Sequence, residues 1–328
     1  MEFTRESRDH ATWLLICLAS LFCAAALQAG DYALEAGSLA AAAGLLGLLF
    51  LAQGAAARAE RWRWLAGAMP LFAQMLAFSV AGVVLSYLAA GAGGPLWDAR
   101  LLAWDAALGF DRASAFAFLD AAPALATGGW IAYHSLVPQM IVLILALAAA
   151  GRLGAARVLL FASTAAGAAA ILLSLFLPAL GNLYHPAAYP RLGASAAWLH
   201  RPDILALREG GLRVLDLASM KGIITFPSYH AALGAIYIWA FWQLARWRWI
   251  GIGWALLTIL ATPAAGGHYL VDVLAGLALG AAAIPLGRAA AAWDARRLVP
   301  AAPALAWRSA DSGAPGRNRG AGAREAVF

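Results

Sequence analysis

Charged side chains are scarce in this sequence. Only 12% of its 328 residues are Asp, Glu, Lys or Arg, whereas 63% are hydrophobic. An average soluble domain carries about 25% charged residues, because its surface must be solvated. The composition therefore excludes an ordinary cytosolic enzyme, a disordered protein and a coiled coil.

Cysteine and lysine are scarcer still. The two cysteines, Cys17 and Cys23, share one apolar run, which excludes a disulfide framework. Lys221 is the only lysine among 23 basic residues, and the formal net charge is +6. Most of the arginines lie in the segments that connect apolar runs. We therefore interpret the charge as a sign of membrane topology and expect no nucleic-acid partner.

Long apolar runs are abundant, by contrast. A bilayer core of about 30 Å requires about 20 apolar residues in a helix. Eight runs approach this length, which predicts an all-α fold, a polytopic membrane helix bundle with eight transmembrane helices. The runs cover residues 11–29, 36–57, 65–92, 125–150, 158–180, 226–245, 250–266 and 269–286.

The basic residues predict the side of the membrane on which each connection lies. With the N-terminus inside, 16 of the 23 basic residues fall on the inner side and 7 on the outer side. The short connections 58–64, 151–157 and 246–249 all carry arginine and all fall on the inner side. We expect a multi-pass protein of the bacterial inner membrane, with both termini in the cytoplasm and the outer connections in the periplasm.

Two outer connections, 93–123 and 181–225, are too long to be simple turns. The first places Trp97, Leu101, Trp104 and Leu108 at helical spacing, which predicts a helix in the membrane interface. This helix is either an anchor or the lid or floor of a lipid site. We expect three regions, which are N-terminal helices with the interfacial helix (1–124), a catalytic membrane domain (125–290) and a disordered cytoplasmic tail (291–328).

Two short segments carry the residues best suited to chemistry. In Phe-Pro-Ser-Tyr-His, residues 226–230, the proline predicts a helix start, where free N–H groups and the helix dipole form an anion site. Ser228 adds a hydroxyl donor. In Gly-Gly-His-Tyr-Leu-Val-Asp, residues 266–272, His268 and Asp272 would share a helix face, so that the carboxylate fixes the imidazole tautomer. Both segments fall on the outer side, so we expect them to converge.

Together the two segments resemble the signature of the type 2 phosphatidic acid phosphatase (PAP2) superfamily, whose blocks are Lys-x6-Arg-Pro, Pro-Ser-Gly-His and Ser-Arg-x5-His-x3-Asp. The form Phe-Pro-Ser-x-His with Gly-Gly-His-Tyr-x-x-Asp-x-x-x-Gly, ending at Gly276, is most similar to the branch that contains inositol phosphorylceramide synthase. The resemblance implies that His268 is the nucleophile, that Asp272 orients it and that His230 protonates the leaving oxygen. This scheme requires no metal or other cofactor.

The sequence departs from the broad family pattern in three places. Tyr229, which with Ser228 is a candidate substrate contact, stands where the second block has Gly. Ala261-Thr262 replaces Ser-Arg, and Ala194 stands seven residues before Arg201-Pro202, where the first block has lysine. Three residues on the outer side are candidates to supply the missing positive charge: Arg208, Arg213 and Lys221.

The remaining histidines are less informative. His134 lies about ten residues into the fourth run, beside Ser135 and Gln139. This polar stripe is either an interhelical hydrogen-bond network or the wall of a head-group cavity, and His134 is a candidate substrate contact. His10 and His200 have no context that indicates a function.

Three functions are compatible with these residues. The first is a membrane phosphatase or phosphotransferase that acts on a lipid phosphate through a phosphohistidine; water as acceptor gives hydrolysis, and an alcohol such as inositol gives head-group transfer. The second is a metal-dependent membrane hydrolase with His230, His268 and Asp272 as ligands. The third is a non-enzymatic lipid carrier. The expected partners are a lipid substrate and the bilayer, and nothing indicates an obligatory protein partner.

Overall fold

The computed structural model describes residues 9–297, so most of the predicted tail lies outside the described residues. The described chain is a helical bundle with one parallel pair of two-residue strands, in which Ala33 pairs with Val214. The longer helices are α1 (His10–Ala29), α2 (Ala36–Arg58), α3 (Arg63–Gly91), α8 (Leu153–Phe176) and α12 (Leu270–Arg297). The shorter ones are α4 (Asp98–Ala107), α5 (Arg112–Ala121), α6 (Pro123–His134), α7 (Leu136–Ala149), α9 (Ala196–Arg208), α10 (Tyr229–Trp242) and α11 (Arg248–Ala261). The strands are β1 (Ala33–Leu34) and β2 (Val214–Leu215), and single turns are η1 (Glu60–Trp62), η2 (Pro186–Ala188) and η3 (Thr262–Gly266).

Six helices of the described chain are long and apolar enough to cross a membrane, or seven if the bent pair α5–α6 counts as one span. The prediction of eight spans is therefore not confirmed. The expected fourth span is divided at Ser135 into α6 and α7. The expected sixth span is α10, whose 14 residues extend about 21 Å, less than the hydrocarbon thickness of about 30 Å.

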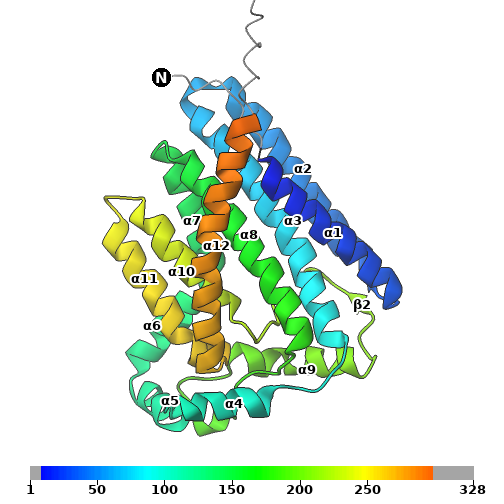
Figure 1. Cartoon of the computed structure of the whole chain (residues 1–328), viewed down its shortest axis with the longest axis vertical. Coiled ribbons are helices and arrows are strands. Elements are labelled where there is room, and N and C mark those ends of the chain that lie inside the picture. Colours follow the sequence, from blue (N-terminus) through cyan, green and yellow to red (C-terminus); the bar gives the residue numbers. More distant parts are fainter. Residues whose placement is uncertain (1–8, 298–328) are drawn as a thin grey trace, which may run out of the picture.

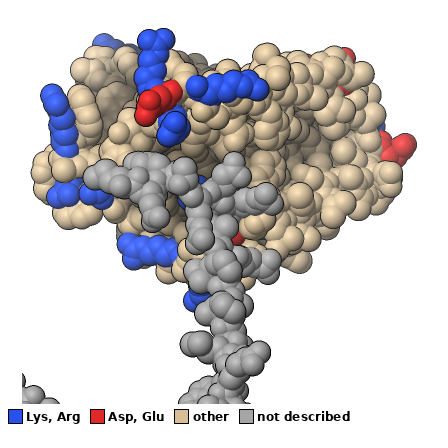
Figure 2. Space-filling view, turned by 90° about the horizontal axis from the view of Figure 1, so that it is seen from above, with Lys and Arg blue, Asp and Glu red and all other residues tan. Residues whose placement is uncertain are grey.

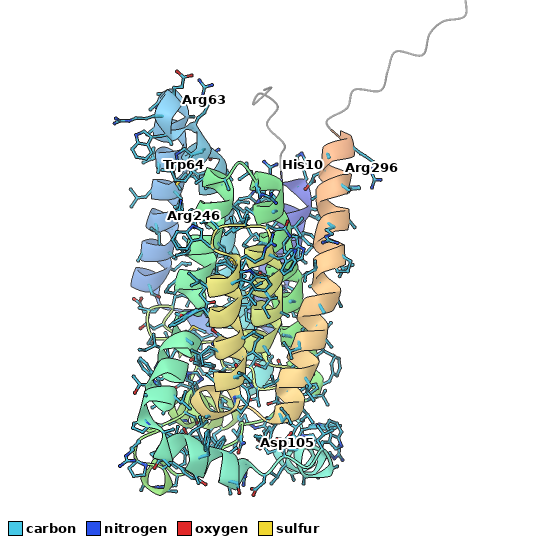
Figure 3. The ribbon with its side chains drawn as sticks, turned by 90° about the vertical axis from the view of Figure 1, so that its left-hand side faces the viewer. His10, Arg63, Trp64, Asp105, Arg246 and Arg296 are labelled. Atoms are coloured by element: carbon cyan, nitrogen blue, oxygen red, sulfur yellow. The ribbon has the colours of Figure 1, made fainter. Side chains whose placement is uncertain are left out.

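The two ends of the bundle differ in their side chains and in their architecture. Helices α4, α5 and α9 lie across one end (Figure 1). Arg63, Arg246 and Arg296 lie at the opposite end, far from Asp105 of α4 (Figure 3). Viewed onto the arginine-bearing end, Lys and Arg side chains predominate over Asp and Glu on the visible face (Figure 2). The arginine-rich connections therefore share one end of the bundle, as the sequence predicts.

The expected interfacial helix is two helices. Gly109, at φ +76°, ends α4 in the left-handed conformation that glycine adopts without strain. Asp111 then begins α5, because its carboxylate accepts hydrogen bonds from the N–H groups of Ala113 and Ser114. Leu101 of α4 is fully buried. The segment is thus packed onto the bundle rather than only onto lipid.

Helices α3, α7, α8, α10 and α12 enclose the largest apolar core. The close approach of α10 and α12 depends on glycine in α12. A Cβ atom at Gly276 would overlap the carbonyl oxygen of Ser228, and one at Gly280 would overlap that of Ala232. The glycine that ends the sequence motif therefore allows the start of α10 to lie against α12, which brings the two motif segments together.

Candidate functional site

His268 is held by its Nδ1 atom. This atom lies 2.9 Å from the carbonyl oxygen of Thr225 and 3.4 Å from Oδ2 of Asp272. Both partners are acceptors, so Nδ1 carries the proton and Nε2 keeps its lone pair. His268 is 4% exposed. The ring is thus fixed in the tautomer that leaves Nε2 available as a nucleophile.

The local backbone around His268 is not the helix that the sequence predicts. Helix α12 begins at Leu270, and His268 precedes it, directly after Gly267 at φ +73°. Asp272 lies in the first turn of α12 and is fully buried. Its Oδ2 also accepts the backbone N–H of Tyr269 at 2.9 Å. The carboxylate therefore fixes both the imidazole and the turn that carries it.

His230 lies in the first turn of α10 and faces His268. The centroids of the two imidazole rings are 6.4 Å apart. His230 is stacked on Tyr133 of α6 with a centroid distance of 3.9 Å and an interplanar angle of 8°, which sets the plane of its ring. The spacing between the two imidazoles leaves room for one small group between them.

The residues before His230 have structural contacts. Ser228 is the N-cap of α10, which begins at Tyr229, two residues later than the predicted start at Pro227. The Oγ atom of Ser228 accepts the N–H of Ala231 at 3.3 Å. The hydroxyl of Tyr229 donates to the carbonyl oxygen of Ser163 in α8 at 3.0 Å. Both side chains therefore bind protein groups in this structure.

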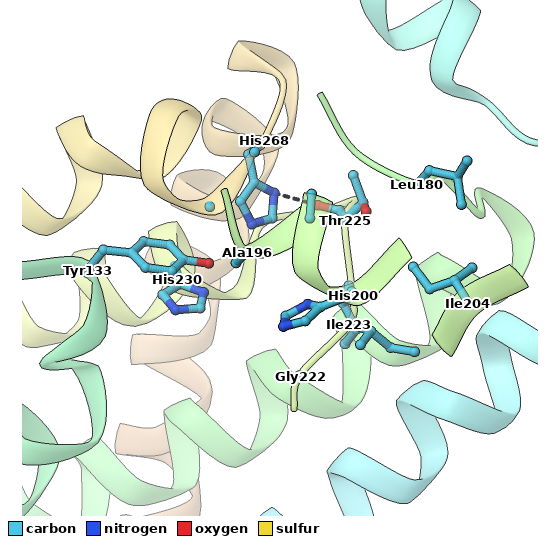
Figure 4. Close-up of a pocket in the computed structure, with 14 residues that line it drawn as sticks. Tyr133, Leu180, Ala196, His200, Ile204, Gly222, Ile223, Thr225, His230 and His268 are labelled. Carbon is cyan, nitrogen blue, oxygen red and sulfur yellow. Dashed lines mark hydrogen bonds between the residues drawn. The ribbon is translucent and has the colours of Figure 1, made fainter. Parts of the chain in front are cut away.

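A small cavity of about 20 Å³ joins the two histidines, with room for about one water. His200 of α9 also lines it, together with Tyr133, Thr225 and Gly267 (Figure 4). Burial, with the nearby Lys221 charge as second cause, lowers the pKa of His200 to about 4, so this imidazole is neutral at pH 7. His200 lies in no local sequence motif, and the other two histidines that line the cavity come from distant segments.

The comparison with known families decides the class of the protein. A family model of the PAP2 superfamily matches residues 99–286. The chain belongs to the PAP2 superfamily. Members of this superfamily are generally phosphatases or phosphotransferases. The match extends from α4 into α12, so it contains the site, whereas α1, α2 and α3 lie outside it. No curated protein and no solved structure gives a significant match.

Helix α4 is attached to the PAP2 motif through two carboxylates that belong to no sequence motif. Asp105, 1% exposed, accepts the N–H groups of Leu270 and Val271 at 2.8 and 2.9 Å, and so caps the start of α12. Asp98 accepts the hydroxyl of Tyr269 at 3.1 Å and the N–H of Gly181 at 3.0 Å. The segment predicted as either an anchor or a lid thus fixes the backbone beside His268 and Asp272.

The three candidate basic residues do not line the histidine cavity. Arg208 donates to the carbonyl oxygens of Gly93 and Gly94, and it lines a neighbouring cavity of about 20 Å³. Arg213 donates to the carbonyl oxygen of Gly30 at 2.8 Å. Lys221 is exposed, and its charge acts on His200. Within the described chain, the side chains that line the histidine cavity include no Arg or Lys.

The polar stripe on the fourth run forms an interhelical network. Gln139 donates to the hydroxyl of Thr258 at 3.0 Å, and Trp254 donates to the hydroxyl of Ser135 at 2.9 Å. His134 is exposed and stacked on Trp130, and its Nδ1 contacts the carbonyl oxygen of Trp130 at 2.9 Å. His134 therefore lies outside the histidine cavity.

Among residues 9–297, no three His, Cys, Asp or Glu side chains have an arrangement that could hold a metal ion. Asp272 directs its bonded oxygen to Tyr269 and to Nδ1 of His268. The two groups are thus engaged with each other and with the backbone, while Oδ1 of Asp272 is buried without a hydrogen-bond partner.

Asp105 provides a direct test of the role of α4. Replacing it by Ala leaves the N–H groups of Leu270 and Val271 without acceptors, at a cost of about 1–3 kcal/mol in unfolding free energy. We expect Asp105→Ala to lower both the melting temperature and the rate of phosphate-ester cleavage per folded molecule, and Asp105→Asn to lie between it and the wild type. Quench-flow with a labelled phosphate ester measures the rate.

The matched control is Asp111→Ala, which removes the exposed cap of α5 and leaves α12 capped. This variant is expected to cleave the phosphate ester at the wild-type rate per folded molecule. An unchanged rate in Asp105→Ala would show that the cap of α12 has no part in the chemistry.

Proposed function

We propose that this protein is a membrane phosphatase or phosphotransferase that acts on a lipid phosphate through a phosphohistidine at His268. One observation carries the proposal: two acceptors hold Nδ1 of His268, so that Nε2 is the free nitrogen of a ring that faces His230 across a small cavity. A nucleophile, an orienting carboxylate and a second imidazole are the parts that acid–base-assisted phosphoryl transfer requires.

The reaction has two steps. In the first, Nε2 of His268 forms a bond to phosphorus as the bond from phosphorus to the leaving oxygen breaks, and His230 gives its proton to that oxygen. In the second, water or an alcohol attacks phosphorus, the P–N bond breaks, and His230 takes the proton of the attacking hydroxyl. Asp272 stabilises the positive charge that develops on His268 while the ring is bonded to phosphorus.

The choice of a lipid substrate is supported by the position of the cavity. Its lining includes residues of α6, α9, the first turn of α10 and the segment before α12. Helix α9 lies with α4 and α5 across one end of the bundle (Figure 1). At that depth a head-group phosphate would meet the histidines while its acyl chains stay in the hydrocarbon region. Attack by water would give a phosphatase. Attack by an alcohol would give transfer of a phosphate-linked head group, of the phosphoinositol type suggested by the resemblance in sequence.

Additional positive charge for the substrate phosphate would come from Arg208, Arg213 or Lys221, and Ser228, Tyr229 and His134 are the other candidate contacts. In this structure Arg208 and Arg213 donate to backbone carbonyl oxygens and do not line the histidine cavity. We propose no nucleic-acid partner and no obligatory protein partner. A metal-dependent hydrolase is the second candidate for an enzyme, and sensitivity of activity to a chelator distinguishes the two.

Substitutions of the two histidines should have different effects on activity. His268→Ala should abolish phosphoenzyme formation from every substrate. His230→Ala should lose about 10²–10⁴-fold on a lipid phosphate ester, whose alkoxide leaves only with a proton. The same variant should keep much of its rate on an aryl phosphate, whose phenolate leaves without help. Asp272→Asn should lie between the two variants. Rapid-quench detection of acid-labile phosphohistidine with both substrates makes the comparison.

The control is His10→Ala, an exposed histidine at the arginine-bearing end of the bundle. Equal losses on both substrates in His230→Ala would refute its role as general acid. A normal phosphoenzyme in His268→Ala would show that another residue is the nucleophile. Absence of a phosphoenzyme in the wild-type chain with every substrate would favour a non-enzymatic lipid carrier.

We also propose that the site faces the periplasm of a bacterial inner membrane, with both termini in the cytoplasm. The 16 to 7 distribution of basic residues supports this orientation. In a background without Cys17 and Cys23, a membrane-impermeant maleimide should label Ser219→Cys, near the site end, in intact cells. It should not label Gly154→Cys, at the arginine-bearing end, until the cells are lysed. Both positions are exposed. The reverse pattern would contradict the orientation.

A further inference from the structure

A much larger cavity lies apart from the histidines, between α1, α3 and α8. Its volume is about 550 Å³, within the range of about 300–1,000 Å³ that small-molecule sites occupy. Its walls are almost wholly apolar and include Leu15, Ala19, Phe22, Leu85 and Ile171. Helices α1 and α3 lie outside the part of the chain that the family model matches, whereas α8, the third wall, lies inside it.

The cavity exists because α1 is fixed at both of its ends. At one end the backbone N–H of Ala11 donates to the carboxylate of Asp294 in α12 at 3.3 Å. At the other end β1 pairs with β2, and the N–H of Glu35 donates to the carbonyl oxygen of Leu215 at 2.9 Å. Between these attachments, small lining residues such as Ala26 and Ala168 leave the space open.

One end of the cavity carries a cation. Arg213 lines it beside Tyr32, and its guanidinium carbon lies 4.7 Å from the centroid of the Tyr32 ring. Its Nη1 donates to the carbonyl oxygen of Gly30. These contacts hold the guanidinium at the C-terminal end of α1. An arginine has five N–H donors, so it can bind an anion while it keeps this bond.

We propose that this cavity binds one phospholipid with a net negative head group. Its acyl chain lies between α1, α3 and α8, and its head group contacts Arg213. The lining residues of α1 extend from Leu15 to Ala29, about 21 Å along the helix, which is more than half of a hydrocarbon core of about 30 Å. One acyl chain of a phospholipid therefore fits along this wall, with the charged head group of the lipid at Arg213. The proposal does not depend on the proposed reaction.

Native mass spectrometry of the full chain, purified in a mild detergent, tests it. We expect one bound phospholipid per chain. After lipid removal, phosphatidylglycerol should rebind more tightly than phosphatidylcholine, whose head group has no net charge. Arg213→Gln should weaken phosphatidylglycerol binding about tenfold, the loss expected of one charge-assisted hydrogen bond, and leave phosphatidylcholine binding unchanged.

Two variants fill the cavity, Ala26→Trp and Ala168→Phe, and both should lose the bound lipid. The matched control is Leu18→Trp, which adds a large side chain to the exposed face of the same helix, outside the cavity. Arg213→Gln changes an exposed side chain, so it tests the proposal even if the filling variants do not fold. The proposal is overturned if the wild-type chain binds both lipids equally or if folded Ala26→Trp retains lipid as the control does.

Discussion

The site depends on one constraint, the pair of acceptors that share Nδ1 of His268. The Thr225 carbonyl belongs to the segment before α10, and Asp272 belongs to α12. The imidazole therefore keeps its orientation only while α10 and α12 remain in register. The overlap that a Cβ at Gly276 would produce explains why α12 has glycine where α10 begins. The backbone N–H of Ser228, which donates to the carbonyl oxygen of Asp272 at 3.0 Å, fastens the same two helices.

Side chains of α4 and α5, at one end of the bundle, hold the segments beside His268 in place. Asp105 caps α12, and Asp98 binds both Tyr269 and the backbone of Gly181. Arg112 extends the attachment, because its guanidinium donates to the buried side chain of Asn182 at 2.6 Å. These contacts connect α4 and α5 with the two loops that surround the histidines. Helices α4 and α5 are thus part of the site, whereas α1 borders a separate apolar cavity.

The sequence predicts the residues of the candidate site better than the residues that hold them in place. His230, His268 and Asp272 could be selected because each lies in a short motif with local spacing, and the structure brings them together. Asp105 could not, because its partners lie 165 and 166 residues away and the residue resembles the polar face of an amphipathic helix. His200 likewise has no local motif. The eight predicted spans are not confirmed, because the fourth apolar run is divided at Ser135 and α10 has only 14 residues.

The central claim is that Nε2 of His268 bonds to phosphorus while Nδ1 stays bound to Thr225 and Asp272. Phosphorus-31 NMR of the trapped phosphoenzyme, denatured at alkaline pH, distinguishes the two phosphohistidine isomers, and mass spectrometry of its peptides identifies the residue. The account predicts a single phosphate on Nε2 of His268. A phosphate on Nδ1, or on His230 or His200 in place of His268, would contradict it.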